Sequence, residues 1–374
     1  MANNRVYYAV QGVRLRGPSG TNVVPKNTGW DRIQGLQTVG INTNFNLEPI
    51  YQMGQLELYD NFEEVPDVEV SLNKVFDGFP LIYQMAQGTG ALVEIANNRC
   101  GVQFAVFADT ASAATGVPQT LLQIEPAYVS SATYTFSTEG NFTEDVTIVA
   151  NDKAWIDPAS YDWGDYTPGV GVDNAGYGFR VSPTGFGIAR RQQIKLSNCV
   201  LPTGGVDSVD YKKGGFDPNS KINSVTITAN LNREEIRTLG ERTPFLRYIN
   251  FPVEITAEFE LTAASGDMVG LPANANEVCA NPKALENQAI KIALCDGTYF
   301  DLGRKNKLTT VNMAGGDTGG GNATVTYSYT TYNDFIFHPG TGRMDADGNG
   351  NFDTDPVGIF ESMSAPGEDY NFQN

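Results

Sequence analysis

Two stretches of the sequence share one pattern and decide the expected fold. They are VGINTNFNLEPIYQMG at Val39–Gly54 and VTITANLNREEIRTLG at Val225–Gly240. At a constant offset of 186 residues, as from Val39 to Val225, they share a valine, two isoleucines, two asparagines and a glycine. An offset held over this length indicates two copies of one supersecondary unit, and the alternative is coincidence among common strand residues. The similarity continues at Pro66 with Pro252 and, after a one-residue slip, at Glu69 with Glu254.

Each copy is expected to hold a half-buried strand followed by a short helix. Apolar and polar residues alternate from Val39 and from Val225, as in a strand with one buried face. Asn232 is followed three residues later by Glu235, which is a capping-box pattern, and Gly240 suits a left-handed helix end. The first copy offers a matching set, with a proline in the first turn: Asn46, Pro49, Ile50, Met53 and Gly54.

The rest of each half follows a common order of strand, short helix, hairpin and a final strand rich in Thr, Tyr and Val. Turn signals of the Asn-Asn and Asp-Gly type separate the strands of the hairpins. The expected segments are Val68–Leu72, Leu81–Ala86, Leu92–Ala96, Val102–Ala108 and Val146–Val149 in the first half, and Glu254–Leu261, Pro282–Gln288, Ile290–Cys295, Thr298–Leu302 and Val325–Tyr332 in the second.

Composition narrows the class of protein. The 374 residues carry 43 acidic and 25 basic side chains, for a net charge of −18, and include 40 glycines and 19 prolines. Many turn residues favour an all-β fold, and the charge argues against a general nucleic-acid binder, because phosphates would be repelled. With the single histidine His338 the chain cannot build a multi-His zinc site. Neither a secretory signal at Met1–Val6 nor a membrane-spanning apolar run is expected.

The four cysteines are expected to be reduced thiols. None of them forms a C-x-x-C pair, so the sequence offers no metal ribbon or redox motif. Without a secretory signal, buried thiols are the ordinary state, and a disulfide between Cys279 and Cys295 is the alternative.

The sequence divides into two expected domains. Residues 1–187 form the first and residues 188–374 the second, which ends in an acidic C-terminal tail. From about residue 157 to 187 the first domain includes a linker rich in Gly, Tyr, Asp and Pro. This linker is either an ordinary surface loop or an aromatic arm that contacts a neighbouring subunit.

One segment near the C-terminus carries a calcium-loop pattern. It matches D-x-[DN]-x-[DN]-G, in which oxygen ligands on alternate residues wrap one cation. The twelfth position holds Pro356 in place of the usual bidentate glutamate, and Glu361 lies further on. A plain Asp/Asn/Gly turn is therefore favoured over a Ca²⁺ site, whose ligands would be Asp345, Asp347, Asn349, Asn351 and Asp353.

No other segment offers a catalytic or cofactor site. The glycine-rich stretch Gly315–Asn322 lacks the Lys-Ser/Thr of a phosphate loop and precedes a strand, so a hairpin tip is expected there. The acidic pairs Glu63-Glu64 and Glu234-Glu235 and the basic group Arg190, Arg191 and Lys195 are interpreted as solvated faces. We find no nucleophile with a base and an orienting group, His338 is expected to be structural, and we expect no enzyme.

The order of these segments resembles bacteriophage tail tube proteins. The resemblance lies in Gly54 followed by Pro66 and Val68–Leu72, in Leu239-Gly240 with Pro252–Thr256, and in Leu302–Val311 leading to a glycine-rich loop and a Thr/Tyr strand. It covers most of both repeats and consists of pattern and order. The linker and the C-terminal tail have no counterpart in it.

The resemblance implies two tandem β-barrel or sandwich domains with short helices. In that family six such domains form a ring, the inner strands pair across subunits, and the rings stack into a tube. We therefore expect a virion tail protein, assembled in the host cytoplasm, that self-associates into rings of three chains, with six chains as the competing assembly. Sheath or other tail proteins would be further partners. Genomic DNA would pass through the lumen without being bound specifically. No membrane partner is expected.

Two other functions remain open at this stage. Another virion structural protein, such as a capsid decoration or tail terminator protein, would also be rich in strands and inert. A calcium-dependent glycan-binding or adhesion module would use the Asp345 loop and surface aromatics.

Overall fold

The computed structural model describes most of the chain. The described residues are 6–18, 30–77, 81–87, 98–110, 118–157, 188–191, 194–197, 222–241, 244, 246–263, 287–294, 298–316 and 321–338. The calcium-loop pattern, nearly all of the 157–187 linker and the predicted strand Leu92–Ala96 lie outside these residues, as do residues 282–286 of the predicted helix Pro282–Gln288.

Strands dominate the described residues, and most of them join one large sheet. Its members are β1 (Gln11–Arg16), β2 (Asp31–Arg32), β3 (Leu36–Asn44), β6 (Asp67–Val75), β7 (Cys100–Val106), β8 (Thr120–Ser137), β9 (Thr143–Ala150), β10 (Ala154–Ile156), β12 (Ile222–Asn230), β15 (Glu254–Thr262), β18 (Lys307–Ala314) and β19 (Thr324–Tyr332). A short 3₁₀ helix, Tyr8–Val10, precedes β1.

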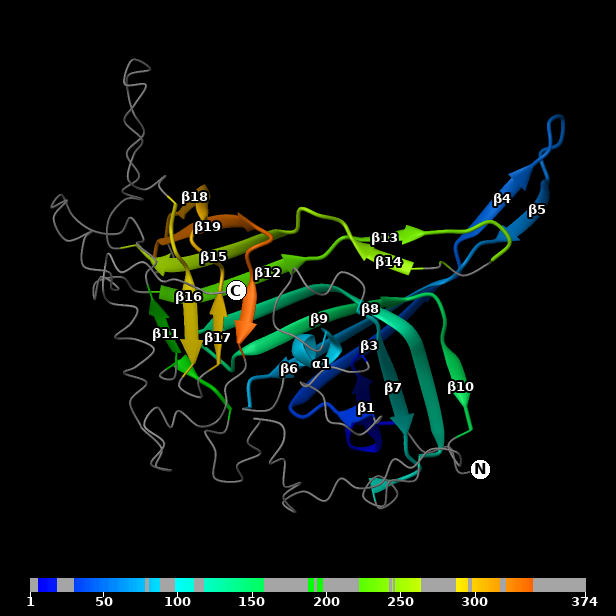
Figure 1. The fold of residues 1–374 in the computed structure, drawn as a ribbon, viewed down its shortest axis with the longest axis horizontal. Helices are drawn as coiled ribbons and strands as arrows, with labels where there is room; N and C mark the ends of the chain where they lie inside the picture. Colours follow the sequence, from blue (N-terminus) through cyan, green and yellow to red (C-terminus); the bar gives the residue numbers. More distant parts are fainter. Residues whose placement is uncertain are drawn as a thin grey trace, which may run out of the picture.

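The long strand β8 divides this sheet into two runs. Its first part pairs with β7 and β10, and β7 continues to β1 and β2. Its second part lies between β9 and β12 in the run β3-β6-β9-β8-β12-β15-β19-β18, in which every pairing is antiparallel. We call this run the main sheet. It joins strands from both halves of the sequence into one surface (Figure 1).

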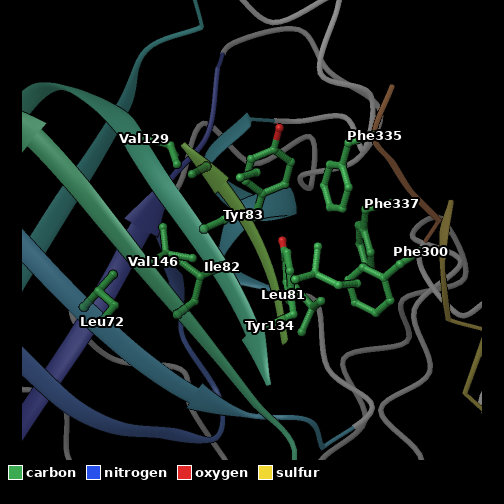
Figure 2. Packing of buried hydrophobic residues seen from close by; sticks show 14 of the residues in the cluster. Leu72, Leu81, Ile82, Tyr83, Val129, Tyr134, Val146, Phe300, Phe335 and Phe337 are labelled. Atoms are coloured by element: carbon green, nitrogen blue, oxygen red, sulfur yellow. The ribbon is translucent and has the colours of Figure 1, made fainter. Parts of the chain in front are cut away.

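One face of the main sheet carries the core. Helix α1 (Ile82–Gln87) packs on it, and so does a second sheet of β11 (Ile194–Ser197), β16 (Lys291–Leu294), β17 (Tyr299–Asp301) and β20 (Ile336–His338). Aromatic rings link the two halves, because Phe300 of β17 lies 4.7 Å from Tyr134 of β8, measured between ring centroids. Figure 2 shows this packing around Tyr83, Tyr134 and Phe300. Burial of these apolar side chains is the main force that holds both halves in one core.

Two hairpins extend from the main sheet on the same side (Figure 1). They are β4 (Leu47–Tyr51) with β5 (Leu58–Glu63), and β13 (Arg233–Ile236) with β14 (Leu246–Ile249). The prediction of short helices in these segments is wrong. Asn46 and Asn232 have φ of 43° and 37°, which is the left-handed region and not the extended backbone of a helix N-cap. Antiparallel pairing with residues further along the chain replaces the expected helical turns.

The all-β fold class with little helix is confirmed. The helix predicted at Leu81–Ala86 is α1, and the hairpin predicted from Ile290–Cys295 and Thr298–Leu302 is β16 with β17. The expected barrel is not confirmed, because among the described residues no strands close into a barrel. The main sheet stays open because β3 pairs only with β6 and β18 only with β19 within that part of the chain.

Candidate assembly surface

The β8–β12 pairing joins the two halves of the chain. Seven residue pairs stand opposite one another, from Ser224 with Ser137 to Asn230 with Ser131. Backbone hydrogen bonds extend the ladder at both ends: the Leu231 N–H donates to the Ser130 carbonyl at 2.8 Å, and the Thr138 N–H donates to the Asn223 carbonyl at 2.9 Å. On the core side Ile227 and Tyr134 face each other and are fully buried. We call this pairing the internal junction.

The strands on either side of the internal junction match in geometry. The pairing of β3 with β6 shifts between Leu36 and Thr38, and the pairing of β12 with β15 shifts between Ile222 and Ser224, again 186 residues apart. Similar shifts occur in β8 against β9, between Val129 and Ser131, and in β18 against β19, between Leu308 and Thr310. Such irregularities bend a strand locally, so β3 and β12 bend at matching positions, and so do β18 and β8.

The turns that follow β3 and β12 also match. The Asn46 N–H donates to Asn44 Oδ1 at 3.3 Å, and the Asn232 N–H donates to Asn230 Oδ1 at 3.2 Å. At the hairpin turns Gly54 and Gly240 have φ of 89° and 91°, a conformation that glycine adopts without steric cost. The predicted left-handed glycine at each of these positions is therefore correct, although it belongs to a hairpin.

One part of the predicted correspondence needs correction. Glu254 stands opposite Asn230, and Asp67 stands opposite Asn44, the residue that matches Asn230. The counterpart of Glu254 is thus Asp67, and the predicted match with Glu69 is wrong. The reason is that the second half has one extra residue between the hairpin and β15, where Phe251-Pro252-Val253 stands in place of Val65-Pro66.

The strands at the two ends of the main sheet have exposed or half-buried side chains. Core-side residues Val39 and Ile41 of β3 and Leu308 and Val311 of β18 pack on the core but stay partly exposed. Met313 is half exposed, whereas its counterpart in β8, Tyr134, is fully buried. Unpaired backbone groups and half-covered apolar side chains are what a strand edge offers to another strand.

The second face of the main sheet is polar and acidic. Along its strands the residues that point away from the core are mostly Thr, Ser and Asn, with hydrogen bonds such as that from Asn73 Nδ2 to Asp145 Oδ1 at 2.6 Å. Ser224 Oγ donates to Glu260 at 3.1 Å in the same way. We call this surface the polar face. Among these described positions the only basic residue is Lys307, and the acidic ones are Asp67, Glu69, Asp145, Glu254, Glu258 and Glu260.

The hairpin β13–β14 is fixed to the first half of the chain by ion pairs. Arg247 Nη2 lies 2.9 Å from Asp67 Oδ1, its Nε donates to Asn151 Oδ1 at 3.0 Å, and Glu235 completes the group. The Arg237 guanidinium bridges Glu235 and Glu64. Arg247 is only 8% exposed, so this network shields its charge with partners from both halves.

Arg233 adds a buried cation to the same hairpin. Its Nε donates to the Val129 carbonyl at 2.7 Å, and its guanidinium lies over the Tyr128 ring. Burial lowers the pKa of Arg233 to about 10. Burial also raises the pKa of the nearby Cys100 thiol to about 12, so Cys100 is a neutral core residue at neutral pH.

A second buried polar group lies under helix α1. Glu144 of β9 accepts hydrogen bonds from the Ile82 N–H at 2.6 Å and the Tyr83 N–H at 3.0 Å, and so caps the helix. Lys74, directly opposite Glu144 in β6, donates to Asp77 and to the Gln34 carbonyl. Burial raises the pKa of Glu144 to about 7 and lowers that of Lys74, although Asp77 opposes the second shift. Glu144 thus fixes the start of α1 to β9.

The candidate residues that the structure describes do not gather into one site. Asp345, Asp347, Asn349, Asn351 and Asp353 lie outside the described residues, so the calcium prediction stays untested. Glu64 and Glu235 belong to the ion-pair network, Glu63 pairs with Leu47 in the hairpin, and His338 pairs with Tyr299 in the second sheet. Sequence reasoning missed Lys74, Glu144 and the Arg247 network, because a single charged residue in a strand carries no sign of its burial.

No three His, Cys, Asp or Glu side chains in the described ranges lie close enough to hold a metal ion. Within the same ranges, no helix has the length and apolar character needed to cross a membrane.

Solved structures include chains that are similar to this one. No family model matches the chain, and no curated protein matches it. Among solved structures, a chain of the anti-feeding prophage (AFP) baseplate is similar, with 13% sequence identity and a TM-score of 0.31. The match covers 42% of this chain and 97% of that chain.

Proposed function

We propose that the chain is a virion structural protein that forms a tail tube from stacked rings. The observation that supports this proposal is the match between the ends of the main sheet and its internal junction. β3 and β12 bend at matching positions, and so do β18 and β8. Because β12 and β8 pair within the chain, β3 of one chain and β18 of the next are suited to pair in the same way.

The internal junction supplies the register of the new contact. Transferring its pairs to the two edges places Ile41 opposite Met313 and Asn42 opposite Asn312. The half-buried apolar side chains of both edges would then be covered, and the backbone groups would be paired. The same edge contact repeated head to tail closes into a ring when the rotation per chain permits it.

Three chains for each ring follow from the proposed duplication. If each half of the chain is one unit, three chains supply the six units that the resemblance to tail tube proteins implies. In such a ring internal and intermolecular junctions alternate, and the main sheet becomes continuous around the ring. A ring of six chains is the competing assembly.

The polar face suits the wall of a channel for DNA. Its acidic residues and near absence of positive charge would repel phosphates, so DNA would slide along the wall without binding. Core, helix α1 and the second sheet all lie on the opposite face, which leaves the polar face as the surface for the lumen. At the tip of hairpin β4–β5, Met53 and Leu56 are almost fully exposed, which suits contact with the next ring.

A catalytic centre and a bound ion are not part of this proposal. The protein would act through assembly in the virion tail, alongside other tail proteins. The competing virion roles, capsid decoration and tail termination, would place the chain in a lattice or a single terminal ring and not in a tube.

Negative-stain microscopy with a native mass measurement tests the proposed function. We expect rings or hollow filaments, with a ring mass of three chains. A mass of six chains would overturn the stoichiometry and retain the tube. A monomer at every concentration, with neither rings nor filaments, would contradict the proposal.

A further inference from the structure

The internal junction is fastened by charged residues on one face of hairpin β13–β14. Arg233, Glu235, Arg237 and Arg247 all point toward the first half of the chain, where they meet main-chain carbonyls and acidic or amide side chains. The opposite face of the hairpin carries other residues, because side chains alternate along a strand. The contact that orients this hairpin is therefore ionic and polar.

The corresponding face of hairpin β4–β5 has lost almost all of this charge. The two hairpins have the same pairing, since Leu47 stands opposite Glu63 as Arg233 stands opposite Ile249. The counterparts of the charged set Arg233, Glu235, Arg237 and Arg247 are Leu47, Pro49, Tyr51 and Asn61. All four are exposed in the single chain.

The residue before each hairpin shows the same difference. Leu231 is fully buried at the internal junction, where its N–H donates to Ser130. Its counterpart before β4 is Phe45, which is 61% exposed. A phenylalanine exposed at a position that is core in the matched junction indicates a surface that lacks its partner.

The surface that would receive hairpin β4–β5 carries two exposed aromatic residues. Asn151 contacts Glu235 and Arg247 at the internal junction. It follows the Ala150–Val68 pair directly, and in β19 the residue that follows the matching Thr331–Ile255 pair is Tyr332. Glu64, which pairs with Arg237, corresponds to Asn250, and Phe251 follows it directly. Tyr332 and Phe251 are both exposed. Tyr332 therefore stands where the internal junction has the amide Asn151, and Phe251 lies beside Asn250, the counterpart of Glu64. Asp67, the other partner of Arg247, corresponds to Glu254, which keeps a carboxylate.

We propose that hairpin β4–β5 is an apolar clasp that docks on the second half of another copy of this chain. Pro49 packs on Tyr332, Tyr51 packs on Phe251, and Phe45 is buried beneath the hairpin. The proposal rests on the proposed function, because it assumes the β3–β18 contact between chains. The hairpin docks on a second copy of this chain, because the docking surface continues the geometry of the internal junction.

An apolar clasp has a different response to salt from an ionic one. Exposed ion pairs weaken as salt screens them, whereas contacts that bury apolar area do not. The ring contact is thus expected to persist in high salt, while Arg237 and Glu64 at the internal junction are screened. Each chain would keep its charged contact within itself and use the apolar contact only with its neighbour.

The test compares four proteins by sedimentation velocity in 0.05 M and 1 M NaCl: wild type, Tyr51→Ser, Phe251→Ser and the double variant. We expect wild-type rings to form at least as readily in 1 M NaCl. Each single substitution should raise the concentration for half-assembly by about tenfold or more, as for an aromatic interface residue. The double variant should raise this concentration by less than the two single effects combined, because the aromatic side chains of Tyr51 and Phe251 contact each other in the proposed clasp.

Ile50→Ser is the matched control. Ile50 is exposed on the opposite face of the same strand, so its loss should change ring formation by less than about twofold. Thermal unfolding of dilute monomer checks that each variant folds. Rings that dissolve in 1 M salt, or that tolerate Tyr51→Ser as well as Ile50→Ser, would overturn the clasp. A wild type that never assembles would instead overturn the proposed function.

Discussion

Thr133 and Thr228 face each other across the internal junction, with their Oγ1 atoms 3.5 Å apart. They lie between the residue pairs that exchange backbone hydrogen bonds, where opposite side chains approach most closely. Their counterparts on the outer strands are Asn312 of β18 and Asn42 of β3, which lie at opposite ends of the main sheet. If the two edges pair as β8 and β12 do, Asn42 of one chain faces Asn312 of the next in the same way.

We predict that the double variant Asn42→Cys, Asn312→Cys forms disulfides between chains. Opposite side chains of such a pair have Cβ atoms about 4.5–5.5 Å apart, close to what a disulfide needs after small shifts. Oxidation should yield linked multimers on non-reducing gels, and neither single variant should yield them. The pair Thr43→Cys, Asn312→Cys is the control, because the two side chains then point to opposite faces. Equal yields from both pairs would refute the predicted register.

Arg247→Met should destabilise the single chain. The substitution leaves Asp67, Asn151 and Glu235 without their shared partner, at a site where Arg247 is 8% exposed. We expect a loss of about 2–4 kcal/mol in the free energy of unfolding, measured by urea denaturation. Arg237→Met is the comparison, because that side chain is 55% exposed and its ion pairs are screened, so its effect should be much smaller. Equal losses would contradict the assigned role of Arg247.

Glu144 should make stability depend on pH in a defined direction. Burial raises its pKa from 4.5 to about 7, so the folded chain binds the proton more tightly than the unfolded chain. The Glu144 contribution to stability therefore decreases as pH rises from about 4.5 to about 7, by up to about 3 kcal/mol.

Glu144→Gln isolates this contribution from that of Lys74, Asp77 and other titrating groups. The difference in unfolding free energy, wild type minus variant, should be larger at pH 5 than at pH 7.5. Urea denaturation at several pH values measures it. A difference that grows with pH would show that the attraction of the nearby Lys74 charge outweighs desolvation.

A gold label can locate the polar face within the assembled particle. Asp145 points from the polar face near the middle of the main sheet, next to Asn73. We predict that Asp145→Cys, labelled with a maleimide gold cluster before assembly, places the metal along the axis of the tube in micrographs. Glu48→Cys, exposed on the face of hairpin β4–β5 opposite to the clasp, provides a comparison position. Label from Asp145→Cys on the outer surface would exclude the polar face as the lumen wall.

The strands were predictable from sequence because their burial has a period of two. Val39, Val225 and their alternating neighbours mark β3 and β12, and the Thr/Tyr/Val run marks β19. A short segment whose partner is far away carries less information. The pattern Asn232 to Glu235 has the capping-box spacing, but such a cap contributes only about 1 kcal/mol, which the pairing of β13 with β14 outweighs.

The assembly surface was predictable only in part. The offset of 186 residues was visible in the sequence, and it points to related junctions. The open edges, the position of Asp67 relative to Glu254 and the ion pairs of Arg237 depend on strand order and register. Those are set by contacts between distant residues, which no local pattern encodes.

A cryo-EM map of the assembled particle tests the central claim most directly. We expect the map to show β3 of one chain paired antiparallel with β18 of the next, with Ile41 opposite Met313. Particles in which both of these strands remain unpaired, or in which neighbouring chains meet through other elements, would contradict it.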